Sequence, residues 1–142
     1  MSFLFLLACG FEPLSGTYLA SLSNPNDTCG AEQSILDATQ EDQEISVTVN
    51  ETTIDFNGLY TLDRDGNTAS YEEMYDEQNE PGLYTIQVLY AIDITWTKAD
   101  LAEGTAGFEY TCTGDECDNV AAEAGVSLPC EAKYKLSMEL SD

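Results

Sequence analysis

The residues of this sequence that could do chemistry are its cysteines and its carboxylates. Five cysteines supply thiols that can act as nucleophiles or oxidise to disulfides, and 27 Asp and Glu face only 4 Lys and Arg, giving a net charge of −23. The sequence contains no histidine. That absence removes the commonest general base, the Ser-His and Cys-His nucleophile pairs, and the commonest metal ligand. We therefore expect no enzyme, no cofactor and no metal ion.

Two acidic stretches could still bind a cation or form a hydrolytic pair. In an EF-hand loop Gly is sixth and Glu twelfth, whereas counting from Asp63 gives Thr68 and Met74. A hairpin turn at Asp65-Gly66 is therefore favoured over a looser calcium site with Glu72 or Glu73. The acidic run (Glu72, Glu73, Asp76, Glu77, Glu80) is interpreted as a solvated loop. A carboxylate dyad with Asp93 is the alternative, but the alternation of its strand directs Asp93 away from the aromatic residues.

The charge balance limits the partners. Phosphate binding needs clustered Lys and Arg, and the four basic residues (Arg64, Lys98, Lys133, Lys135) are scattered. We expect no nucleic-acid partner and no electrostatic adsorption to anionic lipid. The acidity has two interpretations, which are solubility and a surface for a cation or a cationic partner.

The apolar run Phe3 to Ala8 ends in Leu6-Leu7-Ala8-Cys9-Gly10. This stretch resembles the bacterial lipobox, in which a diacylglycerol joins the cysteine thiol and the chain is cut before it. The resemblance implies that Cys9 is lipidated and that the protein is a lipoprotein with a signal peptide. No Lys or Arg precedes the run, and six apolar residues are few for a signal peptide, so we expect the true start to lie upstream. A short N-terminal strand with a free thiol is the alternative.

The same resemblance implies the organisation and the location. We expect a signal peptide over residues 1–8, a lipidated linker over 9–15 and a single domain over 16–142. Since Gly10, and not Asp, follows the cysteine, the sorting rule of bacteria with two membranes implies the outer membrane. The partner expected is then the membrane itself, reached through the lipid. A protein or small apolar ligand would be a further, unidentified partner.

Four cysteines remain once Cys9 is set aside, and an even number in an exported chain predicts two disulfides. Cys112 and Cys130 flank one loop on the inward faces of their strands, which favours Cys112–Cys130 with Cys29–Cys117. The rival arrangement is Cys112–Cys117 with Cys29–Cys130, because the first and last strands meet if a barrel closes. A zinc site of four thiolates is disfavoured because close C-x-x-C pairs are missing.

Alternating apolar and polar residues predict strands along most of the chain. The clearest run puts Tyr84, Ile86, Val88, Tyr90, Ile92, Ile94 and Trp96 on one face. Further strands are predicted over 16–23, 45–49, 53–56, 59–62, 104–112 and 130–140, with little helix. The fold class expected is all-β, as a single antiparallel meander barrel, with a β-sandwich as the alternative.

Six aromatic residues share the inward face of three of these strands (Tyr84, Tyr90, Trp96, Phe108, Tyr110, Tyr134). They are interpreted first as core. If the barrel has a lumen, the same side chains would line an apolar ligand pocket with hydroxyl groups.

The layout resembles a group of small uncharacterised bacterial lipoproteins with lipocalin-like β meanders. The motifs are the lipobox, Gly16-Thr17-Tyr18, Cys29, the strand ending Tyr110-Thr111-Cys112 and the final Cys130 to Leu136. The resemblance implies a lipocalin-like barrel. The role we expect first is a non-catalytic structural or interaction module on the membrane. A lipocalin-like carrier of a small apolar ligand is the alternative.

Overall fold

A computed structural model describes residues 11–29 and 43–141 of the chain. Eight strands and one helix follow one another in these residues: β1 (Gly16–Asp27), β2 (Gln43–Val49), β3 (Thr53–Phe56), β4 (Tyr60–Asp65), β5 (Thr68–Glu80), β6 (Tyr84–Lys98), β7 (Leu101–Thr113), α2 (Cys117–Ala124) and β8 (Cys130–Leu140). Cys9 and the predicted signal peptide lie outside the described residues. Residues 31–39, where the pattern weakly suggests a helical turn, lie outside them as well.

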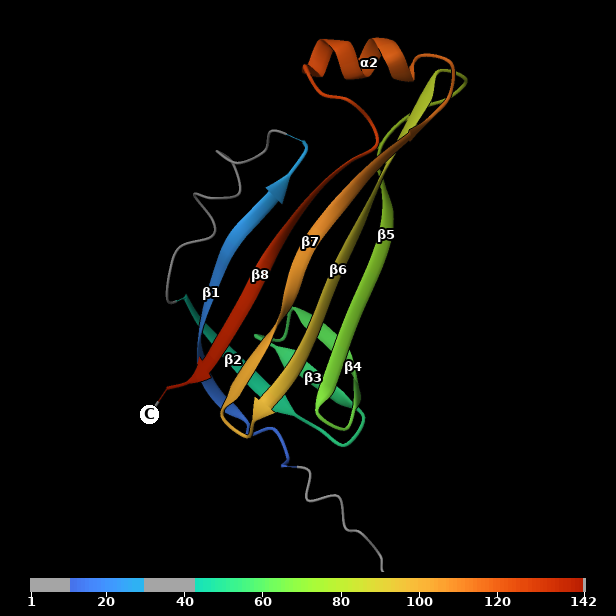
Figure 1. Ribbon diagram of the computed structural model, residues 1–142. Helices are drawn as coiled ribbons and strands as arrows, with labels where there is room; N and C mark the ends of the chain where they lie inside the picture. The colour runs from blue at the N-terminus through green and yellow to red at the C-terminus, as the bar shows by residue number, and fades with distance from the viewer. Residues whose placement is uncertain (1–10, 30–42, 142) are drawn as a thin grey trace, which may run out of the picture.

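The strands form a closed antiparallel barrel in which each strand pairs with the next and β1 pairs with β8. This meander is visible in Figure 1, where the chain colours run around the barrel in sequence order. The prediction of an all-β antiparallel barrel is confirmed. The β-sandwich alternative is wrong, because hydrogen bonds between the first and last strands join the sheet into one closed surface.

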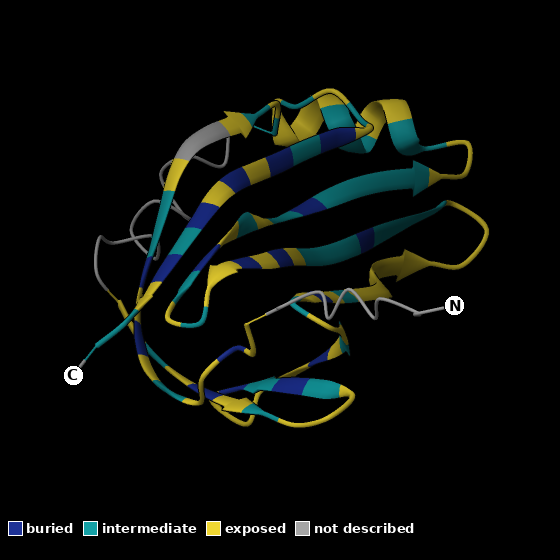
Figure 2. Ribbon diagram, turned by 60° about the horizontal axis from the view of Figure 1, so that its bottom comes forward, coloured by how far each residue is buried: buried dark blue, intermediate teal, exposed yellow. Residues whose placement is uncertain are grey.

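The two strands with the strongest alternation are found almost as predicted. β8 buries every second residue (Cys130, Ala132, Tyr134, Leu136, Met138) and points Lys133 and Lys135 outward. β6 extends two residues past Trp96. Figure 2 shows the resulting bands of buried and more exposed residues along the long strands. The apolar face of each strand therefore lies inside the barrel.

One end of the barrel is filled by a tight apolar core. Trp96 and Tyr18 are both fully buried there, with their rings edge to face and the centroids 6.3 Å apart. The indole Nε1 of Trp96 donates to the hydroxyl of Tyr18 at 3.2 Å, and that hydroxyl donates to the carbonyl of Leu14 at 2.7 Å. Ile54, Leu62 and other apolar side chains complete this core. We call this end the closed end.

The other end is open because three strands are short. β2 pairs with β1 only over Gly16 to Ala20, and β4 pairs with β5 only over Thr68 to Ser70. Beyond those pairs, the described part of the chain is a curved sheet in the order β1-β8-β7-β6-β5. Figure 1 shows these long strands rising above β2, β3 and β4, with α2 at the far end. Among residues 11–29 and 43–141, nothing pairs with or closes over the concave face of this sheet, and we call it the cup.

The predicted acidic loop over residues 72–80 is wrong. These residues form the upper half of β5, which pairs with β6 from Tyr71 opposite Ile92 to Glu80 opposite Tyr84. Among the described residues this half of β5 has no partner on its other side. Charged side chains along such an edge discourage pairing with another chain. The acidity thus suits an edge strand as well as a loop.

The Asp65-Gly66 hairpin is confirmed. Asp65 pairs with Thr68 across a two-residue turn, and Gly66 has a φ of +62°, which glycine adopts without strain. Within residues 11–29 and 43–141, no three His, Cys, Asp or Glu side chains are grouped so that they could hold a metal ion. None of the helices in those same ranges is long and apolar enough to cross a bilayer.

The favoured disulfide pairing is wrong, and the rival is found. Cys29 bonds to Cys130 and Cys112 bonds to Cys117. The loop between β7 and β8 also contains α2, which the sequence analysis did not predict. The Cys112–Cys117 bond ties the first residue of this helix to the end of β7. Gly125, with a φ of +71°, ends the helix.

Candidate functional site

The cup contains two adjoining cavities above the closed end. One has a volume of about 190 Å³ and the other of about 280 Å³. They share four lining residues, which are Leu22, Tyr60, Ile92 and Ala106. Because the same side chains border both, the two cavities adjoin, and we call them together the aromatic cavity.

The wider part of the aromatic cavity is lined mostly by rings. Besides the shared residues, its walls are Tyr71, Tyr90, Ala91, Gly107, Phe108 and Tyr134. The narrower part reaches toward β2 and β3 through Ile45 and Phe56. Apolar walls with a few hydroxyl groups are typical of sites for small ligands.

A third hollow, of about 250 Å³, lies under α2 at the open end. The helix contributes Val120, Ala121 and Ala124, and the sheet contributes Ile86 and Tyr110. The Cys29–Cys130 disulfide, the apolar residues Val126 and Leu128, and the polar pair Glu77 and Gln78 complete its wall. We call this hollow the upper hollow.

Ring contacts connect the upper hollow to the aromatic cavity. Phe108 packs edge to face on Tyr110, with ring centroids 5.1 Å apart, and also lies 5.9 Å from Tyr90. Tyr75 stacks on Tyr90 at 5.7 Å. Tyr110 lines the upper hollow, and Phe108 and Tyr90 line the aromatic cavity. These rings pack in the second apolar cluster of the barrel, around Val88, Phe108, Ala132 and Tyr134, which lies between the two hollows.

Two carboxylates of β5 act on the tyrosines of the cup. A hydrogen bond to Glu73 raises the pKa of Tyr71 to about 12. Burial, followed by the charge of Glu77 and a hydrogen bond to it, raises the pKa of Tyr110 to about 12. A hydrogen bond with Tyr75 is the main cause that raises the pKa of Tyr90, and the charge of Glu77 adds to it. These phenols therefore stay neutral well above pH 10.

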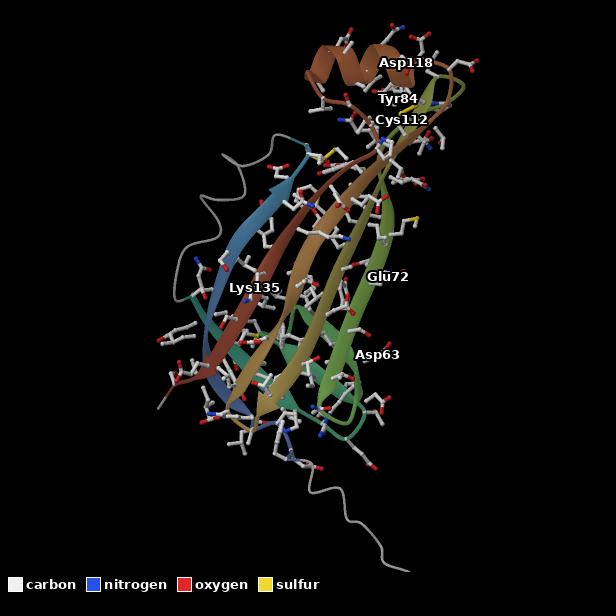
Figure 3. All side chains as sticks on the ribbon, in the orientation of Figure 1. Asp63, Glu72, Tyr84, Cys112, Asp118 and Lys135 are labelled. Carbon is white, nitrogen blue, oxygen red and sulfur yellow. A yellow bond between two sulfur atoms is a disulfide. The ribbon has the colours of Figure 1, made fainter. Side chains whose placement is uncertain are left out.

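Three of the six aromatic residues predicted from the sequence (Trp96, Phe108, Tyr134) are buried in the apolar clusters of the barrel, as the core interpretation predicts. Tyr90, Phe108 and Tyr134 line the aromatic cavity, and Tyr110 lines the upper hollow. Trp96 belongs to the closed end and lines none of the three hollows. Tyr84 lies near the end of the long strands close to Cys112, as Figure 3 shows, and lines none of them either. The structure brings four of the six residues to the cup.

The sequence analysis missed the contribution of β5 and its neighbours. Tyr60, Tyr71 and Tyr75 belong to the cup but were not candidates, and Glu77 was named only as a member of the acidic run. A signal for two of them was present, because Tyr71, Glu73 and Tyr75 alternate with Glu72 and Met74 at the period of a strand. The high acidity of the segment favoured a loop over this alternation.

We expect the cup to lose stability in the alkaline range. The folded state keeps Tyr71 and Tyr110 protonated up to about pH 12, whereas an unfolded tyrosine ionises near pH 10. Their contribution to stability is therefore complete below pH 10 and is lost as the pH rises through 12. Urea unfolding at several pH values, with absorbance at 295 nm to count phenolates, measures this loss.

Tyr71→Phe is the matched variant for that measurement. It removes one late-ionising phenol and should make the decline of stability above pH 10 shallower. A decline that is unchanged in Tyr71→Phe would contradict the assignment of Tyr71.

Comparison of the chain with protein-family models, with curated proteins and with solved structures found no match in any of the three. The candidate site therefore has to be interpreted from its own geometry.

Proposed function

We propose that this protein is a non-catalytic lipoprotein, held on the outer membrane by lipid on Cys9, and that its lipocalin-like barrel carries a small, largely apolar ligand. The observation that supports the carrier role is the aromatic cavity. It lies in the barrel of a single small domain, above the packed core of the closed end and on the concave face of the long strands. A role as a purely structural or interaction module would not require such a hollow.

The position of the N-terminal segment fits an anchor at the closed end. The amide of Leu14 donates to the carbonyl of Ala99 at 2.9 Å, and the hydroxyl of Ser15 accepts from the amide of Val49 at 2.8 Å. Glu12 lies 3.7 Å from Arg64. Residues 12–15 are therefore held against the closed end of the barrel. The predicted linker over 9–15 is packed over this part of its length.

This attachment has a consequence for orientation. Cys9 is two residues before Phe11, and an extended chain advances about 3.3–3.6 Å per residue. Lipid on Cys9 would then place the closed end near the bilayer, with the cup opening away from it. A ligand could enter without first crossing the lipid headgroups.

Mass spectrometry of the protein purified from membranes tests the anchor. We expect a mature chain that begins at diacylated Cys9 and contains two disulfides. The Cys9→Ser variant should be recovered in the soluble fraction. Finding the native protein in the cytosol with its initiator methionine and five free thiols would disprove the lipoprotein proposal.

Calorimetric titration with a neutral apolar ligand, 4-phenylbutan-1-ol, tests the carrier role. We expect saturable binding that Ala106→Leu weakens at least several-fold, because Ala106 lines both parts of the aromatic cavity. Thr105→Leu is the control, since the adjacent residue is exposed on the opposite face of β7. Equal effects of the two substitutions, or no binding at all, would refute the carrier role.

A further inference from the structure

Glu77 is the residue at which β5 departs from its regular register. Asp76 pairs with Gln87 and Gln78 pairs with Ile86, so Glu77 has no opposite residue and forms a β-bulge. Bulges change the direction in which a side chain points. Here the bulge puts two successive side chains, Glu77 and Gln78, in the wall of the upper hollow.

Asp76, one residue earlier, faces the other way. Its carboxylate accepts a hydrogen bond at 3.1 Å from the side chain of Gln87, which belongs to the outward-facing set of β6. Two adjacent carboxylates of β5 thus lie on opposite faces of the sheet. Only Glu77 is in contact with the cup.

Tyrosine rings lie beside this carboxylate. Tyr110 lines the upper hollow together with Glu77, and the charge of Glu77 raises the pKa of both Tyr110 and Tyr90. Tyr75 stacks on Tyr90 with the ring centroids 5.7 Å apart. A carboxylate among electron-rich rings is the chemistry that binds an ammonium group, through charge and through cation–π attraction.

No positive side chain competes for this carboxylate. The chain has four basic residues, all within the described ranges, and none of them lines the aromatic cavity or the upper hollow. Lys133 and Lys135 point outward from β8, and Figure 3 shows Lys135 well below the upper end. Arg64 is bound to the carbonyls of Asn50 and Gly66 near the closed end.

We propose that Glu77, with Tyr75, Tyr90 and Tyr110, binds the head group of a small monocationic amphiphile whose apolar body lies in the aromatic cavity. The single carboxylate matches a single positive charge. The row of rings from Tyr110 through Phe108 to Tyr90 connects the head-group site with the apolar part. The net charge of −23 would draw such a cation toward the protein from solution. This inference rests on the carrier role proposed above.

Three ligands that share one body separate the inference from the carrier role. 4-Phenylbutylammonium, 4-phenylbutan-1-ol and 4-phenylbutanoate carry a positive, a neutral and a negative head group. We would titrate each into the full chain carrying Cys9→Ser, which prevents ligand from dissolving in attached acyl chains. We expect the ammonium compound to bind about tenfold more tightly than the alcohol, and the carboxylate compound to bind most weakly.

Two single-charge variants locate the effect. Glu77→Gln should weaken the binding of the ammonium compound about tenfold and so remove its preference over the alcohol. Asp76→Asn removes the same charge from the outer face of the same strand and should keep the preference.

Each remaining outcome decides a different question. Equal affinity of the wild type for the ammonium compound and the alcohol would overturn the head-group site and leave the carrier role standing. Equal loss of preference in Glu77→Gln and Asp76→Asn would also overturn it, because the effect would then come from overall charge. Binding of none of the three ligands would overturn the carrier role and this inference together.

Discussion

Replacing both Cys29 and Cys130 by serine is expected to lower the free energy of unfolding by about 4–5 kcal/mol. The bond joins residues separated by 101 positions. In the chain-entropy model, a cross-link that closes a loop of about 100 residues lowers the entropy of the unfolded chain and so raises its free energy by about 4.7 kcal/mol. That loss is a large fraction of the ~5–15 kcal/mol that holds a domain folded. The thermal midpoint should fall by about 10–15 °C.

Cys112→Ser with Cys117→Ser is the matched control. This second bond spans only five positions, and the same relation gives a loss of about 2 kcal/mol. Urea unfolding of the two double variants, followed by circular dichroism, compares them directly. An equal loss in the two variants, or a larger loss in the Cys112 and Cys117 variant, would contradict the entropic explanation.

The register of the first and last strands explains why the favoured pairing failed. Asp27 lies opposite Ala132 on β1 and β8, so the same register brings Cys29 opposite Cys130. On the other side of β8, Tyr110 is opposite Cys130, the first residue of β8. Cys112 therefore lies two residues past the point at which β8 begins and has no partner on that strand. Shared inward alternation was correct for Cys112 and Cys130, but alternation does not fix register. Barrel closure, which the rival pairing assumed, decides it.

The parts of the fold that the sequence predicted well are those whose alternation is unbroken. On β6 and β8, inward residues are large and apolar, and outward residues are polar, so the period of two is plain in the letters. The same alternation placed Tyr90, Phe108 and Tyr134 on the inward face. It could not show that the barrel narrows to a packed core at Trp96 and widens into a cavity above it. That difference comes from the short lengths of β2, β3 and β4.

The upper half of β5 was predicted wrongly, as a loop, because its alternation is weak. Its inward positions include Tyr71, Glu73 and Tyr75, and its outward positions include Glu72 and Met74, so polar and apolar residues occur on both faces. A strand at the rim of an open cup is exposed to solvent on both faces. Its apolar and polar residues then need not alternate, and the sequence does not reveal the strand. The bulge at Glu77 breaks the period again. Glu77, the residue central to the proposed head-group site, therefore stood out in the sequence only as one member of the acidic run.

The helix α2 was not predicted from the sequence either. Eight residues from Cys117 to Ala124 contain no buried side chain. Its apolar residues Cys117, Val120, Ala121 and Ala124 have the i, i+3, i+4, i+7 spacing of a helix and are followed by Gly125. The pattern covers only two turns, and helices this short are marginal by themselves in water. The Cys112–Cys117 bond fixes the first residue of the helix to the sheet. Tertiary attachment, and not local propensity, places Val120 and Ala124 over the upper hollow.

Replacing Trp96 by alanine is expected to cost about 3–5 kcal/mol of stability, the usual range for removing a buried large aromatic side chain. Trp96 is fully buried and holds the hydroxyl of Tyr18, which in turn anchors the carbonyl of Leu14. The substitution would leave a void at the closed end and deprive Tyr18 of its donor. Trp96 is also the only tryptophan of the chain, so the variant has to be followed by far-ultraviolet circular dichroism in urea and not by indole fluorescence.

Two further variants determine what such a loss would mean. Trp96→Phe keeps a ring in the core but removes the indole donor, and it should cost clearly less than Trp96→Ala. Leu59→Ala removes an apolar side chain that is 76% exposed, and it should change stability by no more than about 0.5 kcal/mol. If Trp96→Ala cost less than about 1 kcal/mol, the closed end would not be the packed floor of the barrel. Because the aromatic cavity depends on that floor, the carrier role would lose its structural basis as well.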